Sequence, residues 1–141
     1  MIYDPKNNIV KLCIQGMEME AKGKQTEAIK LFMQAWNEAS DNFEKFTAAH
    51  YVARHQKNIA EKLKWDETAL RLALAIKDEY IKEVFPSLYL NIAKCYEDLN
   101  DTNKAKKYYE DALSFINLLP KDGYGNMIKA GIAKGIERVT K

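Results

Sequence analysis

The sequence is poor in the residues that interrupt helices, with three prolines and six glycines among 141 residues. Because glycine and proline are the two residues least favourable inside a helix, their scarcity permits long helices. Alternating apolar and polar runs, which indicate β-strands, are also missing. We therefore expect an all-α protein.

Cysteine is equally scarce. Cys13 and Cys95 are the two cysteines, and they lie far apart in the sequence. A disulfide framework or a zinc site needs clustered or paired thiols, so neither is expected. We predict that both cysteines are reduced and lie in the core or in a groove.

Long hydrophobic runs are absent as well. No stretch approaches the 18 uninterrupted apolar residues typical of a membrane span, and residues 1–6 lack the apolar run of a signal peptide. We expect a protein that does not span a membrane and works in the cytoplasm.

Neither sign of charge dominates: Lys and Arg total 22, Asp and Glu total 20, and the net charge is +2. This balance is too even to favour binding of nucleic acid or a membrane surface by overall charge. The hydrophobic fraction of 47% and the charged fraction of 30% are typical of a folded globular domain.

The residue patterns of enzyme active sites are also missing. If His50 and His55 shared one helix, five residues would separate them by about 140° around its axis, so they could not bind one metal from that helix. We interpret His50 as a hydrogen-bonded structural histidine, weighed against a general base. The glycine-rich segment 122–125 has no strand before it, which disfavours a nucleotide site. We expect no enzymatic activity, no metal and no cofactor.

What the sequence does contain is an internal repeat. When the chain is aligned with itself so that Leu12 falls on Tyr89, small residues fall on small ones and bulky residues on bulky ones. The offset predicts two copies with a third, less regular copy between them. The further matched pairs are Gly16 with Ala93, Met19 with Tyr96, Ala28 with Ala105, Phe32 with Tyr109 and Ala35 with Ala112.

Each clear copy predicts a helical hairpin. Spacings of four and three put Ala28, Phe32 and Ala35 on one helical face, as they do the corresponding residues of the later copy. A ring between two alanines lets a neighbouring helix approach closely. Gly16, on the preceding helix, is the small residue that we expect to meet this ring.

Seven helices are expected. Asp41 and Glu44 have the spacing of a capping box, Gly23 and Asn100 suit left-handed reversals at helix ends, and Pro86 suits a first helical turn. The predicted helices are 7–22, 25–40, 43–61, 64–78, 84–99, 102–118 and 123–139.

The last segment, 123–139, has an apolar face on which Ile128, Ile132 and Ile136 recur every four residues. A repeat array needs a terminal element to cover its last apolar face, so we interpret this segment as a capping helix. Lysines within it exclude a membrane helix. Formation of a homo-oligomer through the same face stays open.

These patterns resemble the tetratricopeptide repeat. The best copy is 86–119, in which Tyr89, Ile92, Ala93, Tyr96, Ala105, Tyr109 and Ala112 fill pattern positions. The other copies are about 9–42 and 49–82, the latter with Gln56 at the small position and Thr68 at the first alanine position. The resemblance implies a single domain over 1–141, a right-handed α-α superhelix (a solenoid) of about seven antiparallel helices, and a concave groove.

The resemblance also implies where a partner would bind. Groove positions of the first copy include Val10, Cys13 and Met17. Those of the other copies add a polar, partly basic floor made by Arg54, Lys57, Asn91 and Lys94. Such a floor suits an acidic side chain or a C-terminal carboxylate. The alternative is that these are solvated residues on a helix face.

We therefore expect a non-catalytic scaffold that binds a protein or peptide partner in its groove. One alternative is a helical-repeat module that binds RNA, although a nucleic-acid partner is disfavoured by the few basic groove residues. Another is an accessory subunit of an enzyme, with a site that includes His50 and His55.

Overall fold

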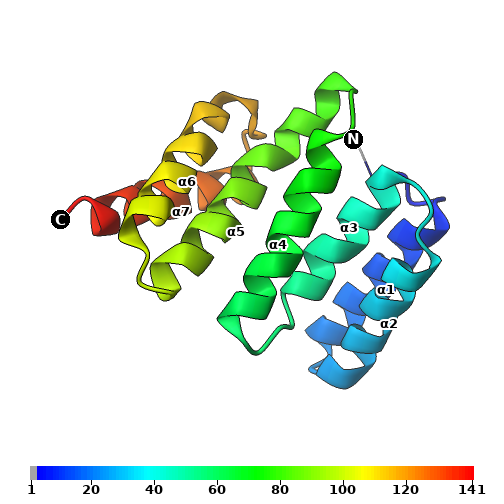
Figure 1. Ribbon diagram of the computed structural model, residues 1–141. Coiled ribbons are helices and arrows are strands. Elements are labelled where there is room, and N and C mark those ends of the chain that lie inside the picture. Colours follow the sequence, from blue (N-terminus) through cyan, green and yellow to red (C-terminus); the bar gives the residue numbers. More distant parts are fainter. Residues whose placement is uncertain (1–2) are drawn as a thin grey trace. The chain divides into compact units, whose positions relative to one another are not determined.

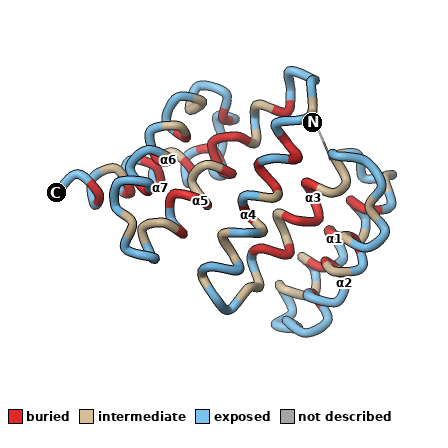
Figure 2. The backbone as a smooth tube through the Cα atoms, viewed as in Figure 1, coloured by how far each residue is buried: buried red, intermediate tan, exposed pale blue. Residues whose placement is uncertain are grey.

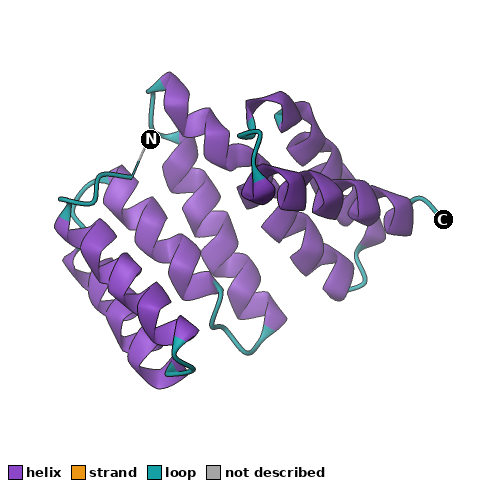
Figure 3. Cartoon of the chain, turned by 180° about the vertical axis from the view of Figure 1, so that it is seen from behind, coloured by secondary structure: helices purple, strands orange, loops and turns teal. Residues whose placement is uncertain are grey.

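The structure, a computed structural model, describes residues 3–141, and this range is helical with no strand (Figure 3). The all-α prediction is confirmed. Figure 1 labels the α-helices of the described range. They are α1 (Asn8–Ala21), α2 (Gln25–Glu38), α3 (Asn42–Ala53), α4 (Ile59–Leu74), α5 (Phe85–Asp98), α6 (Thr102–Ser114) and α7 (Gly123–Val139), with 3-10 helices η1 (Glu79–Val84) and η2 (Ile116–Leu118).

The helices fall into two compact units, Met1–Ile76 and Lys77–Lys141. In the first unit α1 packs against α2, α2 against α3 and α3 against α4, and α1 also contacts α3. In the second unit α5 packs against α6, and α7 packs against both. Consecutive helices packed in this way make an all-α helical repeat. The single domain, its repeat boundaries and the right-handed superhelix stay predictions.

Most helix ends follow the predicted signals. Gly23 and Asn100 have φ angles of 74° and 65°, the left-handed region that glycine and asparagine tolerate best. The Asp41 side chain accepts a hydrogen bond of 2.8 Å from the Glu44 N–H and so caps α3. Pro86 lies in the first turn of α5, where its missing N–H costs no helical bond.

The boundary inside the second hairpin was predicted wrongly. Helices were expected at 43–61 and 64–78, but α3 ends at Ala53 and α4 begins at Ile59. The connection 54–58 contains no glycine or proline, so nothing in its composition marks a turn. Its one signal is Asn58, which caps α4 by accepting from the Glu61 N–H at 3.2 Å.

Two other boundaries also differ. The predicted helix 102–118 ends at Ser114 and is followed by η2, and residues 79–84 form a 3-10 helix that was not predicted. His55 lies in the connection after α3, so the helical angle between the two histidines does not apply to it.

The helix starts set the register of the second hairpin. Helix α1 begins at Asn8 and α3 at Asn42, and the offset between these starts equals the length of one tetratricopeptide repeat. Eight residues before the N-caps of α2, α4 and α6 stand Gly16, His50 and Ala93. The small position of the second hairpin is therefore His50, and not Gln56 as the sequence comparison suggested.

The second hairpin is polar where the other two are apolar. Four and eight residues after the N-cap of α4 stand Lys62 and Asp66, whereas α2 has Ala28 and Phe32 there. The Lys62 Nζ donates to Asp66 Oδ2 at 2.6 Å, and Asp66 is 2% exposed. A pairing partner is needed at this position because an isolated buried carboxylate is costly.

In the other hairpins the core is built on a ring that faces a glycine. A Cβ atom at Gly16 would lie 2.3 Å from Phe32 Cε1, and one at Gly135 would lie 2.2 Å from Tyr109 Cε1. Real Cβ atoms do not approach so closely, so each glycine is what allows the helix to reach the ring. Figure 2 shows buried residues along the inner sides of these helices. The predicted meeting of Gly16 with Phe32 is confirmed.

A glutamate then ties each of these two hairpins to the helix that follows it. Glu20 on α1 accepts from Arg54 Nη2 at 2.9 Å and lies 2.6 Å from His55 Nε2. Glu97 on α5 accepts from Arg138 Nε on α7 at 2.7 Å and from the Tyr109 hydroxyl at 2.6 Å. Both glutamates stand four residues before the N-cap of the next helix.

The hydrogen bond from Arg138 is the main reason why the pKa of Glu97 falls from 4.5 to about 2, with the Tyr109 hydroxyl lowering it further. A lowered folded-state pKa means that the ionised carboxylate stabilises the fold. This contribution is fully present above the unfolded pKa of about 4.5. It is lost as the pH falls from there towards 2.

We predict that Gly16→Ala destabilises the protein by about 1–3 kcal/mol, because the new methyl group overlaps the Phe32 ring. Urea unfolding followed by circular dichroism measures the change. The control is Gly123→Ala, since a Cβ at Gly123 meets nothing within 4 Å. Equal midpoints for the two variants would contradict the ring-and-glycine description.

We predict that Arg138→Gln lowers the free energy of unfolding at pH 7 by about 0.5–1 kcal/mol, since Arg138 is partly exposed and solvent weakens its pair with Glu97. The difference from the unmodified protein should shrink between pH 4.5 and pH 2, where Glu97 becomes protonated. Urea titrations at pH 7, 4 and 2.5 provide the test. A pH-independent difference would rule out the ionic origin, and Lys141→Gln is the control.

Candidate functional site

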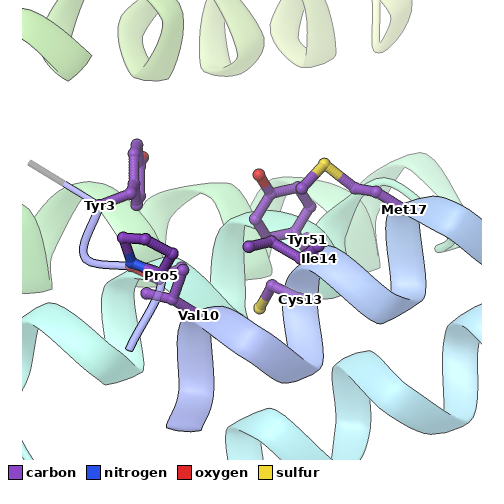
Figure 4. Close-up of a pocket in the computed structure, with 8 residues that line it drawn as sticks. Tyr3, Pro5, Val10, Cys13, Ile14, Met17 and Tyr51 are labelled. Carbon is purple, nitrogen blue, oxygen red and sulfur yellow. The ribbon is translucent and has the colours of Figure 1, made fainter. Parts of the chain in front are cut away.

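An apolar pocket lies in the first unit between α1, α3 and the segment before α1. Its volume is about 230 Å³. Figure 4 shows Tyr3 and Pro5 towards one end and Tyr51 and Met17 towards the other. The residues that line it are Tyr3, Pro5, Val10, Cys13, Ile14, Met17, Thr47 and Tyr51.

The pocket follows from the shared register of the two helices. Cys13 on α1 and Thr47 on α3 are separated by the same offset as the two helix starts, and so are Met17 and Tyr51. Each pair therefore occupies the same position in two successive first helices. Cys13 and Thr47 are short, whereas Met17 and Tyr51, one turn later, are long. A hollow results beside the short pair, with the long pair as its wall.

The other end of the pocket is held by the segment before α1. The Tyr3 ring lies 5.8 Å from the Phe43 ring between centroids. Asn7 caps α1 by accepting from the N–H groups of Ile9 and Val10, and its Nδ2 donates to Glu44 Oε2 at 2.9 Å. This bond to α3 fixes where the segment runs, so the Tyr3–Pro5 wall is part of the fold.

Among the described residues, none that lines the pocket is charged. Burial raises the pKa of the Cys13 thiol to about 12, so the thiol is neutral near pH 7 and is a poor nucleophile. The Thr47 hydroxyl donates to the Phe43 carbonyl at 2.8 Å and is satisfied within its own helix. The lining therefore suits an apolar group.

A cation lies beside this pocket. The Arg54 guanidinium carbon is 5.3 Å from the centre of the Tyr51 ring, close enough for a cation–π interaction. One Nη atom of Arg54 donates to Glu20, and the side chain is 44% exposed. An arginine has five N–H donors, so this one keeps donors for a further acceptor.

The predicted groove residues lie in different places. Met17 lines the pocket, and Arg54 lies beside it against the Tyr51 ring. Lys57 is exposed in the connection after α3. In the second unit, Asn91 is half-buried on α5, and the Lys94 Nζ on the same helix donates to Asp98 at 2.8 Å.

Sequence reasoning missed most of the α3 side of the pocket. Thr47 and Tyr51 were not predicted, because the second helix pair was aligned several residues too late. Counting one repeat length onward from Cys13 and Met17 would have identified both.

His50 is half-buried on α3, and its buried Nδ1 has no hydrogen-bond partner within the described part of the chain, so the interpretation as a hydrogen-bonded histidine does not hold at that atom. Burial, and then the charges of Arg54 and Lys62, lower its pKa from 6.5 to about 4. His50 is therefore neutral at pH 7. Within residues 3–141, no group of three or more His, Cys, Asp or Glu residues could hold a metal ion.

We predict that Cys13 in the folded protein reacts with Ellman's reagent at pH 8 at least about 100-fold more slowly than a free thiol, because burial keeps it protonated. A Cys95→Ser variant leaves Cys13 as the only thiol to be measured. Reaction in 6 M guanidinium chloride is the control and should be rapid. Fast reaction of the folded variant would show that the pocket floor is open and ionised.

Comparison with known families matches residues 86–116, the α5–α6 hairpin, to the tetratricopeptide repeat. Neither the comparison with curated proteins nor that with solved structures found a match. In the described residues, no helix is both long enough and apolar enough to cross a membrane. The matched hairpin contains the ring of Tyr109 and the buried Ala93, Ala105 and Ala112 that the repeat pattern requires. Residues 86–116 thus match the tetratricopeptide repeat, and the all-α architecture of helical hairpins is consistent with this repeat family.

Proposed function

We propose that the protein is a non-catalytic interaction module of the cytoplasm that binds a protein or peptide partner. The observation that supports this most is the pocket between α1 and α3, formed by equivalent positions of two successive first helices. A continuous row of such positions is what makes a concave binding surface in a helical-repeat protein. The tetratricopeptide repeat suggests the same kind of function.

The residues that we assign to partner binding are the predicted Met17, Arg54, Lys57, Asn91 and Lys94. Met17 supplies apolar contact area in the pocket. Arg54 and Lys57 supply positive charge near the end of α3, and Asn91 and Lys94 supply polar groups on α5. Cationic donors of this type bind carboxylates through charge-assisted hydrogen bonds. An acidic side chain or a C-terminal carboxylate is therefore the group that we expect them to contact.

We predict that reversing the charge of these residues reduces partner binding. The test is affinity capture from an extract of the native organism, with quantification of the proteins that the full chain retains. Arg54→Glu and Lys94→Glu should each lower recovery of a specific partner at least about fivefold, a change of about 1 kcal/mol in binding free energy.

The matched control is Arg71→Glu, because Arg71 is exposed on α4 and does not line the pocket. All three variants should keep the helical circular dichroism spectrum of the unmodified chain. Unchanged recovery with both Arg54→Glu and Lys94→Glu would remove the polar groove residues from the binding surface. Failure to retain any specific protein would count against the interaction function itself.

A further inference from the structure

We infer that the pocket of the first unit binds one large apolar side chain of a partner peptide, and that Arg54 binds an acidic residue two or three positions away in the same peptide. This inference rests on the proposed interaction function and specifies the chemistry of the partner. It also changes the sequence-based expectation, in which the floor of the groove was polar and partly basic.

The lining excludes a charged occupant. A charge placed in the pocket would lose its hydration, and none of the described residues that line the pocket carries an opposite charge. The Cys13 thiol stays neutral because burial raises its pKa to about 12, and the Thr47 hydroxyl is already bonded to the Phe43 carbonyl. An uncharged, apolar group is the occupant that this lining accepts.

The volume sets the size of that group. An apolar protein cavity of about 150 Å³ binds benzene, so the 230 Å³ here accommodates a phenyl ring or a branched aliphatic side chain. Ile14 is 36% exposed at the pocket, which leaves apolar surface for such a group to cover. Leucine, isoleucine, methionine and phenylalanine have the required size and character.

Arg54 supplies the charge complementarity. It contacts the Tyr51 ring, and Tyr51 itself lines the pocket. Glu20 is bonded to one Nη atom of Arg54 and also lies 2.6 Å from His55 Nε2. The bond to Glu20 engages one Nη atom, so the exposed guanidinium keeps further N–H donors for an incoming carboxylate.

The spacing along α3 determines the spacing in the peptide. Thr47, at the short pair, precedes Arg54 by seven residues, which corresponds to about 10 Å along a helix axis. An extended peptide advances about 3.3 Å per residue, so two or three residues cover roughly 7–10 Å. The expected ligand is therefore a segment with a large apolar residue and an aspartate or glutamate two or three positions from it.

The test begins with a random dodecapeptide library displayed on phage and selected against the full-length chain. Selected sequences should share the apolar and acidic pair, and synthetic peptides should bind in fluorescence-anisotropy titrations. Replacing the apolar residue of a peptide with serine should weaken its binding at least about tenfold. Replacing its acidic residue with asparagine should weaken binding about threefold or more, and Arg54→Gln should abolish that second difference.

A pair of isoleucines provides the matched protein variants. Ile14→Glu places a carboxylate at the pocket and should weaken binding at least about tenfold. Ile29→Glu introduces the same change on α2, where Ile29 is 40% exposed and outside this pocket, and should stay within about twofold. Thermal unfolding of both variants shows whether they fold.

The outcomes separate this inference from the proposed function. Peptides that bind without the apolar and acidic pair, or that bind equally to Ile14→Glu and Ile29→Glu, would overturn the inference and leave the interaction function standing at another surface. A library that yields no binder would also overturn it, whereas the interaction function is lost only if affinity capture retains no specific partner as well.

Discussion

The contact between an aromatic ring and a residue without a side chain determines how closely the helices of this protein approach. Phe32 needs the bare backbone of Gly16, and Tyr109 needs that of Gly135. The first contact sets the distance between α1 and α2, and the second sets that between α6 and α7. The pocket depends in addition on the register of α1 and α3, which places Cys13 and Thr47 in the same lining.

The three hairpins have different residues at the equivalent packing position of their second helices, namely Phe32, Asp66 and Tyr109. In the first hairpin the ring is Phe32, which has no hydroxyl. Glu20 therefore contacts His55 Nε2 in addition to Arg54. In the second unit the ring is a tyrosine, and its hydroxyl donates to Glu97 directly. The hairpin of α3 and α4 replaces the ring by Asp66, which pairs with Lys62. A buried ion pair is demanding in its geometry, and such groups restrict alternative packing in some proteins.

The helices could be predicted from the sequence wherever packing positions or turn residues leave a recognisable local pattern. Small residues at spacings of four and three predicted the first and last hairpins, and Gly23 and Asn100 predicted their turns. The second hairpin was harder to predict because His50 and Asp66 occupy its packing positions. The other hairpins have a small residue and an aromatic ring at these positions, so the repeat pattern is not visible here. Its turn at 54–58 has no glycine or proline, so the register was placed too late. Met17 and Arg54 were predicted for the site, but the apolar pocket that Met17 lines depends on that register and could not be derived without it.

The segment that carries Tyr3 and Pro5 has a practical meaning for anyone who labels or immobilises this protein. A label coupled to Tyr3 changes the pocket itself, because Tyr3 and Pro5 both line it. The hydrogen bond from Asn7 to Glu44 holds the end of this segment against α3. A label coupled to a residue of the other compact unit, residues 77–141, replaces none of the residues of this wall.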